Sequence, residues 1–136
     1  MLAELVRVTK PGGRIGAVVR ALDLPCWSNL RLNPTLHTKV TRPYSAAGAA
    51  QNGCADASLY HRFAAADLAE TKFFPQLAAG TPEIEPVRLA LVESQIVASL
   101  EPTERAQWQE AAAAAKADGT FFIATGYHCA VGTKRV

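Results

Sequence analysis

The sequence has few cysteines, few aromatic residues and little net charge, and each shortage narrows the class of protein. Three cysteines among 136 residues show no close pairing, which favours a reducing compartment, so we expect a cytoplasmic location. A net charge of +2 without a cluster of lysine or arginine argues against a nucleic acid partner. No apolar run approaches the roughly 18 residues of a membrane helix, and the amino terminus has no secretory signal pattern. We therefore expect no membrane association.

What the chain does contain is typical of a globular protein. Hydrophobic residues make up 49% of it and charged residues 19%, which is enough apolar surface to bury a core. The length predicts a single domain, residues 1–136.

The opening stretch Glu4–Val19 carries the clearest pattern. Apolar residues at helical spacing predict a short helix over Leu2–Val8. Pro11 ends that helix, and Gly12 with the glycine after it favours a tight turn. The run Ile15–Val19 is apolar on both faces, which predicts a strand covered on both sides, as in a parallel α/β sheet.

The segment that follows, residues 23–53, has no sustained periodicity and predicts a long lid or loop. A helix is predicted over Ala57–Ala66, with Asp56 as its N-cap. The next strand is predicted over Ala69–Phe74, with Pro75 ending it.

Residues 86–118 are predicted to form a helical insertion between that strand and the last one. It contains one helix over Val87–Leu100 and another that begins near Pro102 and is capped by Gly119. The alanine run Ala111–Ala115 predicts close packing against a neighbour. A strand over residues 120–125 then continues past a bend or bulge at Gly126 to residue 131.

Two segments carry a resemblance to a known family. The string Glu-Leu-Val-Arg-Val-Thr-Lys-Pro-Gly-Gly-Arg-Ile, which begins at Glu4, resembles the segment that leads into the fifth strand of class I S-adenosylmethionine-dependent methyltransferases. The ending, Asp118–Phe122 followed by Val131–Lys134, resembles their last strand. The resemblance implies a partial Rossmann-like α/β sheet of about three strands, mixed in direction, whose last strand is antiparallel.

The same resemblance implies what is missing. In this family a glycine-rich turn after the first strand and an acidic residue after the second hold S-adenosylmethionine, the implied cofactor. No such turn occurs here, because Gly12 and Gly13 precede a strand. The chain therefore resembles the carboxyl-terminal half of the fold, and an upstream reading frame that encodes a glycine-rich strand–turn–helix would indicate that Met1 is an internal start. Its exposed sheet edge is expected to recruit a second copy or a separate amino-terminal half.

Candidate site residues follow from the same topology. In an open α/β sheet, ligands bind beyond the carboxyl ends of the strands, and the loop from Asp23 leaves such an end. The resemblance places the final hairpin near the substrate pocket. The candidates for a pocket that takes a small-molecule acceptor are Cys26, Trp27, Asn29, Tyr127 and His128. A packing role is the alternative for each. Cys54, Asp56 and His61 lack the regular spacing of a metal site, so none is expected.

Two functions remain open from the sequence. The first is the substrate-side half of an S-adenosylmethionine-dependent methyltransferase, inactive as an isolated chain. The second is a non-catalytic module that dimerises or binds a small ligand through the same half-fold. The methyl acceptor is not indicated by either reading.

Overall fold

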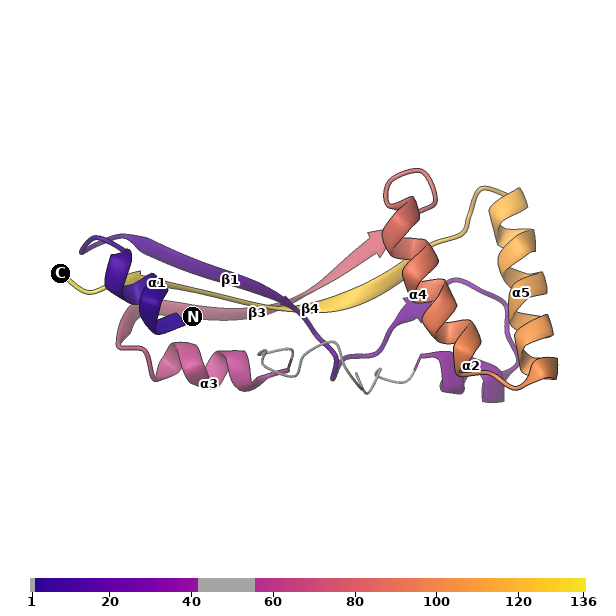
Figure 1. The fold of residues 1–136 in the computed structure, drawn as a ribbon, viewed down its shortest axis with the longest axis horizontal. Helices are drawn as coiled ribbons and strands as arrows, with labels where there is room; N and C mark the ends of the chain where they lie inside the picture. The colour runs from indigo at the N-terminus through magenta and orange to yellow at the C-terminus, as the bar shows by residue number, and fades with distance from the viewer. Residues whose placement is uncertain (1, 42–55) are drawn as a thin grey trace. The chain divides into compact units, whose positions relative to one another are not determined.

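The computed structural model describes residues 2–41 and 56–136, which form a mixed α/β fold with five helices and a four-stranded antiparallel open sheet (Figure 1). The elements in chain order are α1 (Leu2–Val8), β1 (Arg14–Arg20), β2 (Trp27–Ser28), α2 (Pro34–Val40), α3 (Ser58–Ala64), β3 (Leu68–Gly80), α4 (Pro86–Ala98), α5 (Pro102–Ala117) and β4 (Ile123–Lys134). Within these residues, no helix is both long enough and apolar enough to cross a membrane.

The chain divides into two compact units, each built from separate stretches of sequence. The first unit contains residues 1–24, 44–77 and 126–136, and the second contains residues 25–43 and 78–125. The second unit groups the whole of the predicted helical insertion, residues 86–118, with part of the predicted loop. The single domain over residues 1–136 stays a prediction.

The first unit is organised by β4. This strand lies between β1 and β3, and its register with β1 runs from Arg14 opposite Thr133 to Arg20 opposite Tyr127. Because β4 separates β1 from β3, no two parallel strands are neighbours among the described residues. The predicted antiparallel last strand is confirmed, but the predicted mixed sheet of about three strands needs correction, because the pairing is antiparallel and the short β2 adds a fourth strand.

The opening turn forms as predicted. Helix α1 has the predicted bounds, and Gly12 adopts a φ of 76°, a conformation that other residues rarely take. Lys134 fixes this turn from the other end of the chain. Its backbone pairs with Gly12 and Gly13, and its Nζ donates a 2.8 Å hydrogen bond to the carbonyl oxygen of Thr9 just after α1.

The core of the first unit lies on one face of its sheet. Helix α3 and strands β1, β3 and β4 supply its buried residues, which are Ile15, Leu59, Phe63, Leu68 and Ala130, and Leu2 and Val6 of α1 pack against them. The other face is different, because Val18 is 70% exposed. The prediction that β1 is covered on both sides is therefore wrong within the described residues.

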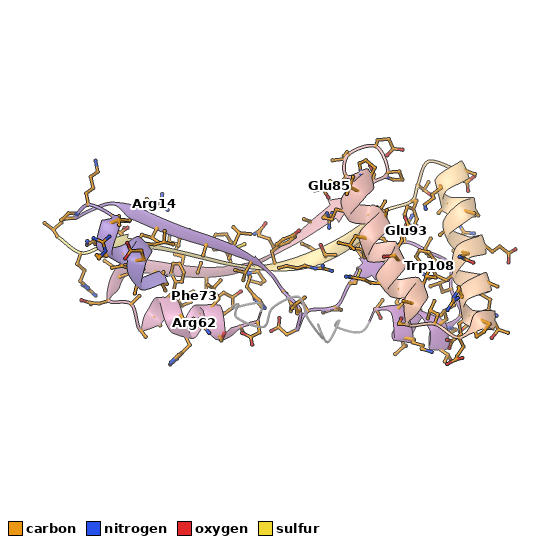
Figure 2. All side chains as sticks on the ribbon, in the orientation of Figure 1. Arg14, Arg62, Phe73, Glu85, Glu93 and Trp108 are labelled. Carbon is orange, nitrogen blue, oxygen red and sulfur yellow. The ribbon has the colours of Figure 1, made fainter. Side chains whose placement is uncertain are left out.

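The second unit has a helical core. Helices α4 and α5 span most of the predicted helical region, and Pro102 occupies the first turn of α5 as predicted. Leu89, Val92 and Ile96 form the buried stripe of α4 at helical spacing, and Trp108 of α5, labelled in Figure 2, is also buried. Most of the alanine run is not packed closely, since Ala112 alone is buried among residues 111–115.

Several local predictions need correction. Helix α2 lies inside the predicted loop, because Asn33 caps its start and Pro34 fits its first turn. The N-cap of α3 is Ala57, while Asp56 accepts a hydrogen bond from the backbone of Ser58. Strand β3 continues through Pro75, which an edge strand tolerates because no neighbour requires its N–H. The predicted loop residues 42–53 lie outside the described residues.

Candidate functional site

A buried histidine connects three elements of the first unit. His128 of β4 is 3% exposed, and both of its ring nitrogens have partners. Its Nδ1 lies 2.7 Å from the hydroxyl of Tyr60 on α3, and its Nε2 lies 2.6 Å from Oδ1 of Asp23, just beyond β1. We call these three residues the Asp23–His128–Tyr60 cluster.

The strand register explains how this cluster forms. His128 lies opposite Val19, and side chains alternate along a strand, so it shares the core-facing side of β4 with Ala130. Helix α3 packs on that side and brings Tyr60 over the imidazole, with the two rings at 89° and their centroids 5.1 Å apart. The Tyr60 ring also lies 5.1 Å from that of Phe73, labelled in Figure 2.

Asp23 ties the cluster to the start of α3. Its second carboxylate oxygen, Oδ2, accepts a hydrogen bond of 3.2 Å from the backbone N–H of Ala57, the N-cap residue of α3. A single carboxylate therefore fixes both the imidazole and the first turn of the helix that carries Tyr60.

The hydrogen bonds assign the protons within the cluster. An ionised carboxylate can only accept, so Nε2 of His128 carries the hydrogen that points to Asp23. In the neutral imidazole Nδ1 is then an acceptor, and the Tyr60 hydroxyl donates to it. Burial raises the pKa of Tyr60, and the nearby Cys129 and Asp23 raise it further. The phenol is thus neutral at physiological pH.

This arrangement is suited to proton movement along a fixed path. If Tyr60 received a proton from a bound group, it could pass its own proton to Nδ1, and Asp23 would stabilise the resulting imidazolium. The same bonds also satisfy a histidine that would otherwise be buried with unpaired nitrogens. Cys129 contributes no nucleophile here, because burial raises the pKa of its thiol.

The structure places the sequence-predicted residues in different surroundings. His128 belongs to the cluster, but Tyr127 points to the opposite face of β4, because successive side chains alternate. Cys26, Trp27 and Asn29 belong to the second unit. Whether these five residues share one pocket stays a prediction.

The three candidates in the second unit have identifiable packing roles. Cys26 is buried, and the Trp27 ring, which is half-exposed, meets that of Phe122 edge-on at 5.3 Å. The side-chain amide of Asn29 bridges two backbone groups. It donates a 2.6 Å hydrogen bond to the carbonyl oxygen of Thr120 and accepts a 3.3 Å hydrogen bond from the N–H of Phe122. Asn29 thus holds the segment after β2 against the segment before β4.

The second unit also contains a groove of about 880 Å³, a volume in the range of small-molecule sites. One face of α5 and the segment from Asn29 to Leu36 line it. Its apolar lining residues are Ala111, Ala114 and Ala115 of α5 with Leu30, Leu32 and Leu36. Its polar lining residues are Asn29, Arg31, Asn33, Gln107, Glu110, Asp118 and Thr120.

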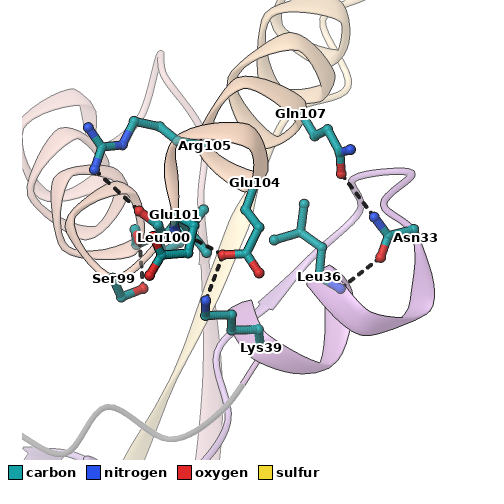
Figure 3. A network of polar contacts seen from close by, with 10 residues as sticks. Asn33, Leu36, Lys39, Ser99, Leu100, Glu101, Glu104, Arg105 and Gln107 are labelled. Carbon is teal, nitrogen blue, oxygen red and sulfur yellow. Dashed lines mark hydrogen bonds and ion pairs between the residues drawn. The ribbon is translucent and has the colours of Figure 1, made fainter.

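A network of polar contacts holds this groove together (Figure 3). Asn33 caps α2 through a 2.9 Å hydrogen bond from the N–H of Leu36 and donates at 2.9 Å to Gln107 of α5. Lys39 of α2 forms a 2.6 Å ion pair with Glu104 of α5. The Lys39 ammonium, followed by the backbone N–H of Glu101, lowers the pKa of the Glu104 carboxyl.

Sequence reasoning did not identify Tyr60 as a site residue, because its position fits the apolar stripe of α3. No spacing rule links residues 23, 60 and 128, since the register of β1 with β4 and the packing of α3 bring them together. The described part of the chain contains no group of three or more His, Cys, Asp or Glu side chains suited to a metal ion. Cys54, one of the residues considered for a metal site, lies outside it.

Comparisons with models of protein families, with curated proteins and with solved structures gave no match.

Proposed function

We propose that this chain is the substrate-side, carboxyl-terminal half of a class I S-adenosylmethionine-dependent methyltransferase and that it works only when an amino-terminal half completes it. The observation that carries the proposal is the position of β4, which lies between β1 and β3 and runs antiparallel to its neighbours. The resemblance carried by Glu4–Ile15 and by Val131–Lys134 implies a last strand of this kind, beside the strand that follows the Pro-Gly-Gly turn.

The local structure around this turn gives further support. Helix α1, the turn at Gly12 and strand β1 follow one another in the order that the resemblance implies. Helix α3 directly precedes β3 and packs on the same face of the sheet as α1.

The described residues do not fit the cofactor. Gly12 and Gly13 lie between a helix and a strand, whereas a nucleoside site of this type needs a glycine-rich turn from a strand into a helix. The described strand-to-helix connections contain no such turn. We therefore assign no cofactor-binding residue to this chain and derive no methyl-transfer step from it.

Calorimetric titration tests the proposal. S-adenosylmethionine is expected not to bind this chain alone, and it is expected to bind after co-expression with the amino-terminal half of a class I methyltransferase. A reading frame upstream of the Met1 codon that encodes a glycine-rich strand–turn–helix would support the proposal. Binding by the isolated chain, or no binding after co-expression, would contradict it.

A non-catalytic role in binding a small ligand is the second candidate, and the groove along α5 favours it. The small side chains of Ala111, Ala114 and Ala115 line it together with polar residues, which leaves room for a ligand. Replacing Ala114 with Trp would fill the groove. A ligand-binding module is expected to lose binding in that variant, whereas complementation with an amino-terminal half would restore cofactor binding regardless of the groove.

A further inference from the structure

The outer edge of β1 has no partner among the described residues. Strand β1 pairs with β4 along one side, from Arg14 to Arg20, and no described strand pairs with its other side. Half of its backbone N–H and C=O groups therefore face outward, with no described strand to form hydrogen bonds with them. Such an edge is a template for the addition of another strand.

The side chains on the exposed face of β1 form a defined pattern of charge and size. Alternation places Arg14, Gly16, Val18 and Arg20 on the side away from the core that contains Ile15. Gly16 is exposed, and a side chain added there would meet only ordinary contacts with Val131. The face is thus apolar at its centre and basic at both ends.

Neither of the two guanidinium groups forms a hydrogen bond or an ion pair within the described part of the chain. Arg14, labelled in Figure 2, is exposed, and Arg20 is partly exposed. Arg14 and Arg20 are six residue steps apart along the extended strand, which is about 20 Å. Their charges are therefore available to a strand of similar length.

This charge pattern disfavours a second copy of the chain. If two β1 strands paired antiparallel about Ala17, the register that uses all seven residues would place each Arg14 opposite the Arg20 of the other copy. Like charges directly opposite each other on one face of a sheet are destabilising. Both ends of the pairing would carry this penalty.

We propose that the β1 edge binds a strand of different sequence, with acidic residues opposite Arg14 and Arg20 and a large apolar or aromatic side chain opposite Gly16. Opposite charges would pair at both ends, and an aromatic ring would cover the space above the edge glycine. In terms of the proposed function, on which the identity of this partner rests, the strand belongs to the amino-terminal half. The pairing preference itself follows from β1 alone.

Two peptides of seven residues test this preference. Each alternates threonine with phenylalanine, and one has glutamate at both ends while the other has lysine. NMR titration of the isotope-labelled full chain measures the affinity, and shifts of β1 amides locate the binding. We expect the glutamate peptide to bind about tenfold tighter, from two favourable cross-strand pairs in place of two repulsive ones, and the difference to shrink as salt is added.

Matched variants separate this effect from net charge. The double variant Arg14→Glu and Arg20→Glu is expected to reverse the preference, whereas Arg62→Glu with Lys72→Glu, the same change of charge on α3 and β3, is expected to keep it. Equal affinities, no binding of either peptide, or a stable dimer through β1 in light scattering would overturn the inference. Peptide binding does not require the cofactor, so it can succeed even if the methyltransferase proposal fails, and the reverse also holds.

Discussion

The two units of this protein are stabilised in different ways, and helices α1 and α4 show the difference most clearly. Helix α4 buries three side chains, Leu89, Val92 and Ile96, whereas α1 buries none and only rests Leu2 and Val6 against the core of its unit. The first unit instead relies on pairing between distant strands and on the Asp23–His128–Tyr60 cluster in its interior. The second unit thus packs the apolar stripes of helices, and contacts such as that of Asn29 with Thr120 join its two separate stretches. The first unit depends on strand register, and among the described residues it leaves one face and one edge of β1 open.

The largest expected effects come from the two cores. Phe63→Ala in the first unit and Trp108→Ala in the second each remove a buried aromatic side chain, and each is expected to cost about 3–5 kcal/mol of unfolding free energy. Denaturant titration measures this cost. Val8→Ala, at an exposed position of α1, is the control and is expected to change stability little. A small loss in only one core variant would mean that the units differ in how firmly they pack.

Breaking the buried cluster is expected to have the next largest effect. His128→Ala leaves the Tyr60 hydroxyl and the Asp23 carboxylate without their shared partner, at a cost of about 1–3 kcal/mol. Tyr60→Phe removes a single hydroxyl and is expected to cost about 1 kcal/mol. Denaturant titration measures both losses of unfolding free energy, and their ratio shows how much of the first unit's stability depends on the imidazole. Equal losses would show that Asp23 gains nothing from the imidazole.

Alkaline pH is expected to weaken the first unit in two steps. The folded-state pKa values of Cys129 and Tyr60 are raised, above ordinary values of 9.0 and 10.0 respectively, so folding favours their neutral forms. The stability that these groups contribute is complete below the unfolded pKa and is lost as pH rises toward the folded one. Melting temperatures above pH 10 test this, and Tyr60→Phe is expected to flatten the second step. An unchanged pH profile in that variant would contradict it.

The smallest expected effect lies in the second unit. Replacing Lys39 with Gln removes the ion pair to Glu104, and because both side chains are partly exposed the cost is expected to stay below about 1 kcal/mol. The lowered pKa of Glu104 contributes stability above its ordinary value of 4.5 that is lost as pH falls through the folded one. The variant is therefore expected to lose stability at neutral pH but little below pH 4, and thermal melts at both pH values measure the difference. A larger loss in acid would contradict this assignment.

Sequence reasoning succeeded where a local signal decides the structure. The bounds of α1, the turn at Gly12 and the start of α5 at Pro102 all depend on residues within one turn of each other. It failed where long-range contacts decide. The sequence of β1 predicts a strand buried on both faces because Val18 is apolar. The arrangement of the strands and helices leaves the face that carries Val18 exposed.

The candidate site shows the same limit. Asp23, Tyr60 and His128 are separated by tens of residues, and their meeting depends on the register of β1 with β4 and on the packing of α3. The start of α2 could have been predicted, because Asn33 followed by Pro34 is a helix-start signal. It was missed because the segment has no sustained apolar periodicity.

The pairing of Arg20 with Tyr127 also bears on how the protein is made. More than a hundred residues separate these strands, so on the ribosome β1 must wait for the whole of the intervening chain before its neighbour exists. Topologies with such distant contacts assemble slowly. Helices α4 and α5 can meanwhile form from nearby sequence, and a newly synthesised chain would expose the apolar side chains of β1 to chaperones until translation delivers the last strand.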